Sequence, residues 1–186
     1  MLHIDFYIIL LATVPSWLWY RNRIYAKNKM VFNIYRELIA NIFFVYLLSV
    51  AYLTLKPFTF IIPFLGGSTF RGSFDTNLFY QLTIVFRNNP QKGILFSLGN
   101  ILMFVPFGAL SPILFKRARS FLNIIVLGFS FSLTIELTQT FFTFSRLATV
   151  DDLFFNTLGA AIGFMLFSIL KSMGTKLNFI NKFTID

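Results

Sequence analysis

The sequence contains no cysteine and a single histidine, His3, close to its N-terminal end. Disulfides, thiolate metal sites and cysteine nucleophiles are therefore excluded, and so are histidine triads and metal sites that need several histidines. Charged residues make up only 12% of the chain, against about 25% in a typical soluble domain. Because 56% of the residues are hydrophobic and 27 residues are Phe, the composition indicates a membrane protein.

Five apolar runs approach or reach the length that is needed to cross about 30 Å of hydrocarbon. They cover residues 4–20, 38–55, 94–115, 121–144 and 153–170. The connection 57–93 is long and partly apolar, which predicts a segment that packs on the bundle or enters the interface rather than a disordered loop. The sequence therefore predicts an all-α, polytopic transmembrane helical bundle of about five spans with a long, partly apolar outer loop.

The basic residues are distributed unevenly between the two sides of such a bundle. Eleven of the 16 Lys and Arg residues lie in 21–36, 116–119 and 171–186, which fall on the same side of a five-span chain. The positive-inside rule places this side in the cytoplasm, with the N-terminus outside and the C-terminus inside. Membrane anchoring then accounts for the net charge of +9, and no nucleic-acid partner is predicted. For the linker 21–36 two interpretations stay open, an amphipathic helix on the membrane surface or a solvated basic loop.

Polar side chains interrupt the fourth and fifth runs at helical spacing. At about 100° per residue, they form one stripe on each predicted helix: Ser132, Glu136, Gln139 and Thr143 on the fourth, and Asp152, Asn156, Gly159 and Gly163 on the fifth. A glutamate inside an apolar run is costly and marks a functional-site hypothesis. We predict an outward-facing ligand pocket that is built from Asn100, Glu136, Gln139, Arg146, Asp151, Asp152 and Asn156.

These residues also have structural interpretations. Glu136 can form an ion pair with Arg146, ten residues further along the same predicted helix and loop. Gln139 and Asn100 can form interhelical hydrogen bonds, each of which contributes about 1 kcal/mol or less. The sequence leaves both interpretations open beside the functional one.

The start of the fifth span contains two further structural signals. Thr149 followed three residues later by Asp152 resembles the capping box that begins a helix, where acidic groups satisfy free N–H groups. The stripe places Asp152 toward the pocket and favours Asp151 as the cap. The spacing of Gly159 and Gly163 is typical of close helix packing and favours that role over ligand contact.

Together these motifs resemble the VanZ-like membrane proteins in order, spacing and residue type. The matching motifs are Asn100-Ile-Leu-Met-Phe-Val-Pro106-Phe-Gly108, Glu136-x-x-Gln139, Arg146, Val150-Asp151-Asp152-x-x-x-Asn156-Thr157-x-Gly159 with Gly163, and Phe60-Ile-Ile-Pro63-Phe64. The resemblance covers residues 53–170, with N-terminal spans and a basic cytoplasmic linker over 1–52 and a basic cytoplasmic tail over 171–186. It implies a bacterial plasma-membrane protein from a family associated with resistance to teicoplanin and other glycopeptide antibiotics.

Three functional hypotheses follow. In the favoured one, the protein is no enzyme and binds a membrane lipid, a lipid-linked cell-wall precursor or a lipoglycopeptide. In the second, Glu136 and Asp152 are the acid–base pair of an enzyme that acts on a lipid or surface polymer. The third is a proton-coupled transporter or flippase. A single chain has no inverted repeat of the kind found in many transporters, but a homodimer would supply a second copy. No cofactor and no metal site are predicted.

Overall fold

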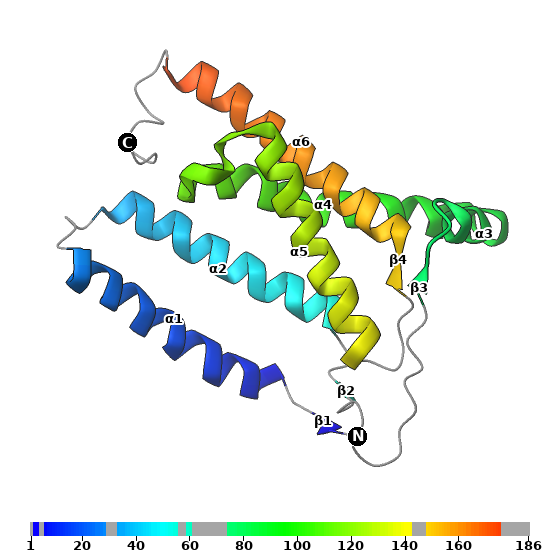
Figure 1. Cartoon of the computed structure of the whole chain (residues 1–186), viewed down its shortest axis with the longest axis horizontal. Helices are drawn as coiled ribbons and strands as arrows, with labels where there is room; N and C mark the ends of the chain where they lie inside the picture. Colours follow the sequence, from blue (N-terminus) through cyan, green and yellow to red (C-terminus); the bar gives the residue numbers. More distant parts are fainter. Residues whose placement is uncertain are drawn as a thin grey trace.

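The computed structural model describes residues 2–3, 6–28, 33–55, 59–60, 74–142 and 148–175. Helices make up nearly all of this part (Figure 1): α1 Phe6–Asn28, α2 Ile34–Leu55, α3 Tyr80–Asn88, α4 Pro90–Leu114, the 3₁₀-helix η1 Lys116–Arg119, α5 Phe121–Phe142 and α6 Val150–Thr175. The two-residue strands β1 (Leu2–His3) and β2 (Thr59–Phe60) pair antiparallel, and β3 (Phe74–Asp75) and β4 (Ala148–Thr149) pair parallel. The predicted all-α helical bundle is confirmed.

Four helices of the described chain are long and apolar enough to cross a membrane, namely α2, α4, α5 and α6. Helix α1 is not among them, but it runs antiparallel along α2. Near one end the rings of Phe6 and Tyr52 contact each other with 4.9 Å between centroids, and near the other Arg21 forms an ion pair with Glu37. With 23 residues α1 is similar in length to these four helices, so the count is roughly consistent with the prediction of about five spans.

The basic linker predicted over 21–36 is not a separate segment. Helix α1 continues to Asn28 and α2 begins at Ile34, while 29–32 lie outside the described residues. The loop interpretation is therefore wrong for most of its length, and the helix that is present is the continuation of α1 and the start of α2 rather than a separate one. The helix continues because the long basic side chains turn back onto aromatic rings: Arg23 lies over the Trp19 ring at 5.1 Å from its centroid.

The long connection 57–93 ends in regular structure. Helix α3 forms within it, and α4 follows after Asn89, whose side chain accepts a hydrogen bond from Lys92 N at 3.1 Å and so caps α4. Pro90 occupies the first turn of α4, where a missing N–H costs nothing. The chain over 56–58 and 61–73, which includes most of the Phe60–Phe64 motif, lies outside the described residues.

Helices α4 and α6 are in backbone contact through glycine. A Cβ at Gly108 would lie 2.0 Å from the carbonyl oxygen of Ala160, and one at Gly163 would lie 2.1 Å from that of Val105. Gly159 is equally restricted. Small residues allow such close approach between membrane helices, so the predicted packing role of Gly159 and Gly163 is confirmed.

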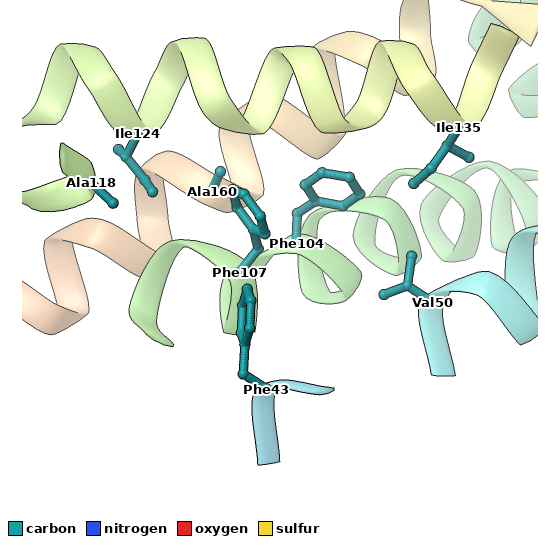
Figure 2. Packing of buried hydrophobic residues seen from close by; sticks show 8 residues of the cluster. All are labelled: Phe43, Val50, Phe104, Phe107, Ala118, Ile124, Ile135 and Ala160. Atoms are coloured by element: carbon teal, nitrogen blue, oxygen red, sulfur yellow. The ribbon is translucent and has the colours of Figure 1, made fainter. Parts of the chain in front are cut away.

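An aromatic core holds α2 and α5 against α4. The Phe131 ring of α5 lies 5.4 Å from the Phe104 ring and 5.2 Å from the Phe107 ring, measured between centroids. Phe43 of α2 approaches Phe107 from the other side at 6.1 Å. Figure 2 shows the buried cluster against which Phe131 packs, which comprises Phe43, Val50, Phe104, Phe107, Ala118, Ile124, Ile135 and Ala160.

The bundle has two chemically different ends. At one end Figure 1 shows the C-terminal ends of α1, α4 and α6, the start of α2, and η1. We call it the basic end, because its described residues include Arg21, Arg23, Lys27, Arg36, Lys116, Arg117, Arg119 and Lys171. The opposite end, with α3, β3, β4, the end of α5 and the start of α6, is called the polar end.

Candidate functional site

The N-terminus of α6 directs one carboxylate into the bundle. Asp152 N donates to Thr149 Oγ1 at 3.2 Å, and the Thr149 hydroxyl donates back to Asp152 Oδ2 at 3.0 Å. This is the predicted capping box, in which the threonine satisfies a free N–H group of the first turn. The Asp152 carboxylate also accepts a hydrogen bond from Asn100 Nδ2 of α4. Asp152 therefore links the start of α6 to α4.

Asp151 points away from this pair. Its carboxylate is only 1% exposed and accepts hydrogen bonds from Phe79 N and from Leu82 N, the latter at 3.1 Å. These N–H groups belong to the first turn of α3 and the residue before it, and Phe79 adopts a left-handed backbone conformation with φ of 63°. Asp151 therefore caps α3, and the prediction that it caps its own helix is wrong, because Asp152 is the residue that pairs with Thr149 at the start of α6. The prediction that Asp151 lines the pocket is wrong as well, because it is absent from the lining of the cavity described below.

The predicted stripe on α5 faces the bundle interior. Ser132, Glu136 and Gln139 are 0%, 3% and 4% exposed. Ser132 Oγ accepts a hydrogen bond from Asn156 Nδ2 at 2.8 Å, which joins the stripes of α5 and α6. Thr143, the last member, lies outside the described residues. So does Arg146, the predicted partner of Glu136.

Gln139 connects α5 to the end of α2. Its Nε2 donates to the Thr54 carbonyl oxygen at 2.8 Å. Helix α2 ends at Leu55, two residues before Pro57, so the carbonyl groups of its last turn have no helical N–H donors. The interhelical hydrogen bond predicted for Gln139 is therefore present, and it satisfies one of these carbonyl groups.

A cavity of about 500 Å³ lies between these groups, within the range of about 300–1,000 Å³ that is typical of ligand pockets. Five of the seven predicted ligand-binding residues line it: Asn100, Glu136, Gln139, Asp152 and Asn156. Its other walls include Thr54 of α2 and Val85 of α3. The lining also includes Leu95 and Gly99 of α4, which are exposed, so the cavity opens to the outside of the bundle beside α4.

The lining is rich in hydrogen-bond acceptors. It contains the carboxylates of Glu136 and Asp152, and within the described part of the lining there is no Lys or Arg. Asn156 Oδ1 is buried and has no hydrogen-bond partner among the described residues. Two carboxylates can supply acid–base chemistry, while no group of three or more His, Asp or Glu side chains that could hold a metal occurs in the described chain.

Sequence reasoning missed Thr54, Val85 and the partner of Asp151. A signal for Thr54 was present, because a helix that ends just before a proline leaves carbonyl groups that need donors. Asp151 is 72 positions from Phe79 and 69 positions from Leu82, so no local sequence pattern indicates this contact.

A model of the VanZ/LLP1 family matches residues 43–171, which is more than half of the chain. The chain belongs to the VanZ/LLP1 family. The VanZ/LLP1 match includes every residue that lines the cavity and leaves α1 outside. It begins inside α2, as does the boundary predicted between residues 52 and 53. No curated protein and no solved structure matches the chain.

Proposed function

We propose that this VanZ/LLP1 protein binds a lipid-linked or lipid-tailed ligand in the cavity at its polar end and so lowers susceptibility to glycopeptide and lipoglycopeptide antibiotics. The observation that carries the proposal is the cavity itself. Buried polar side chains such as Glu136, Gln139 and Asn156 surround a space of about 500 Å³ among membrane-spanning helices. Placing such groups in a membrane bundle costs free energy, so their convergence on an open space favours ligand binding over simple packing.

The charge distribution supports a location of this cavity at the cell surface. Lys and Arg collect at the basic end, which the positive-inside rule assigns to the cytoplasm. The polar end then faces outward across the bacterial plasma membrane, with the N-terminus outside and the C-terminus inside. Lipid-linked cell-wall precursors, the targets of glycopeptides, are exposed on that side. Occupation of the cavity by such a molecule changes the access of the antibiotic to its target.

A susceptibility assay with paired glutamate variants tests the proposal. A deletion strain is complemented with wild type, Glu136→Gln or Glu37→Gln, and protein levels in the membrane are checked by blot. Glu37, the only other glutamate, pairs with Arg21 at the basic end and serves as the matched control. We expect Glu136→Gln to abolish protection against lipoglycopeptides at normal abundance while Glu37→Gln retains it. Full protection by Glu136→Gln would contradict the proposal.

The two carboxylates in the lining favour a second candidate, an enzyme that acts on a lipid or surface polymer. Glu136 is then the general acid or base and Asp152 its partner. Binding and turnover assays on the purified protein distinguish the two candidate functions. An enzyme consumes a lipid-linked substrate and loses turnover in Glu136→Gln while still binding it, whereas a binding module leaves the ligand chemically unchanged.

A further inference from the structure

An apolar groove adjoins the polar cavity. It lies between α2 and α5, has a volume of about 230 Å³ and is lined by Leu47, Val50, Ala51, Thr54, Leu55, Phe131, Thr134, Ile135 and Thr138. Figure 2 shows Val50 and Ile135 pointing toward each other from the two helices. We call this space the α2–α5 groove.

The threonines of the α2–α5 groove do not make it polar. The hydroxyl of Thr54 donates to Val50 O at 2.8 Å, that of Thr134 to Ser130 O at 2.8 Å, and that of Thr138 to Thr134 O at 2.7 Å. Each hydroxyl is therefore bonded to the backbone of its own helix. The walls that remain are methyl groups, aliphatic chains and one aromatic ring, which suit a hydrocarbon chain.

The groove and the cavity share part of their walls. Thr54 and Ile135 line both of them. The hydrogen bond from Gln139 Nε2 to Thr54 O fixes α2 against α5 at this junction. A molecule that extends from one space into the other meets polar side chains on one side of the junction and hydrocarbon on the other.

The cavity indicates which polar group occupies it. Asn156 is 1% exposed, lines the cavity, and has an Oδ1 that no described group satisfies. An unsatisfied buried acceptor is costly, so a hydrogen-bond donor on a ligand is favoured there. The carboxylates of the lining supply further hydrogen-bond acceptors. A head group rich in hydroxyl or amino groups, such as a sugar, matches this lining.

We propose that the ligand is a single-chain amphiphile whose sugar-like head lies in the cavity and whose hydrocarbon chain lies in the α2–α5 groove. This inference rests on the proposed function and names the ligand class and its position. The groove has walls from only two helices and less than half of the volume of the cavity, so it receives one slender chain. Its entrance is on the lipid-facing surface, because Thr134 is exposed and Ala51 is half-buried.

The test is photo-crosslinking in lipid nanodiscs. The probe is n-dodecyl glucoside with a diazirine at the end of its alkyl chain, and the labelled peptides are mapped by mass spectrometry. We expect label on the segments 47–55 and 131–138. Unlabelled dodecyl glucoside should compete, and a single-chain phospholipid with the same alkyl length should not.

Three variants locate the chain and the head separately. Ala51→Phe fills the groove and should reduce the label by about tenfold or more, the scale expected when overpacking closes a site. Ser49→Phe adds the same ring on the exposed face of α2 and should change nothing. Asn156→Ala removes the free acceptor and should also reduce the label, while its elution in gel filtration shows that the protein is folded.

Each remaining outcome overturns the inference in a recognisable way. Unchanged label in Ala51→Phe places the chain elsewhere. Equal competition by the phospholipid means that bulk lipid fills the groove, and a crosslink to a second copy of the chain means that a partner helix does. In all of these cases Glu136→Gln can still abolish antibiotic protection, which leaves the proposed function standing. If Glu136→Gln also protects fully, both proposals fail.

Discussion

The cap that α6 provides for α3 can be removed by a single substitution, Asp151→Ala. The carboxylate of Asp151 is buried and accepts the N–H groups of Phe79 and Leu82. Alanine leaves both N–H groups without an acceptor, while the rest of α6 keeps its helical bonds. We therefore expect α3 to open locally, with little effect on the contact between α4 and α6.

The size of this effect follows from the two hydrogen bonds. A hydrogen bond to a charged group contributes about 1.5–3 kcal/mol, so two give about 3 kcal/mol at the low end. Both contacts are only partly buried, so water can replace the missing carboxylate in the closed variant and recover part of this loss. We expect the free energy of opening of α3 to fall by about 2 kcal/mol, which makes the open state about 30-fold more populated.

The absence of cysteine makes this measurement direct. Val85 of α3 is half-buried and lines the cavity, so Val85→Cys supplies one thiol that reacts when α3 opens. We expect a maleimide to label purified Val85→Cys protein about 30-fold faster when Asp151→Ala is also present. Asp75→Ala is the control, because the Asp75 carboxylate accepts a local hydrogen bond from Asn77 N at 3.0 Å. Equal rates in all three backgrounds would refute the reasoning.

Three further predictions concern packing and topology. Gly163→Ala should lower the free energy of unfolding in detergent by about 2 kcal/mol, because the added Cβ meets a backbone oxygen. Gly99→Ala should not destabilise the protein, because no atom lies within 4 Å of the added Cβ. Tryptophan fluorescence during heating measures the stability of both variants. Phe104→Ala should cost about 3–5 kcal/mol in the same assay, since Phe104 is 0% exposed, and a loss under 1 kcal/mol would contradict the aromatic core. In whole cells a membrane-impermeant maleimide should label Asn77→Cys at the polar end and not Ser120→Cys at the basic end, and the reverse pattern would invert the proposed orientation.

Sequence reasoning located the helices because a membrane segment must satisfy its own backbone groups, so apolar length alone indicates a helix. The predicted ends of the helices were less accurate. Helix α1 continues past the predicted end at residue 20 to Asn28, since basic side chains fold back over aromatic rings and keep the helix compatible with the interface. Helix α3 is only nine residues long and lies in the connection 57–93, for which the sequence predicted packing on the bundle or entry into the interface but no particular helix.

The polar stripes were predictable because helical periodicity determines which side chains share a face. Ser132 and Asn156 do meet across α5 and α6, and Asp152 meets Asn100. The direction of Asp151 was not predictable from α6 alone, because its partner is the backbone of another helix. Helical periodicity predicts the face on which a side chain lies, whereas its hydrogen-bond partner depends on the element that packs against that face.

The glycine contact between α4 and α6 divides the protein into a fixed part and an adaptable part. Backbone atoms that already touch cannot accept larger side chains or slide past one another, so substitutions along this seam are restricted. The groove residues of α2 and α5 and the cavity wall from α3 contribute side chains instead. Exchange of those side chains would therefore change the shape and polarity of the two spaces while the α4–α6 seam, and with it the fold, stays the same.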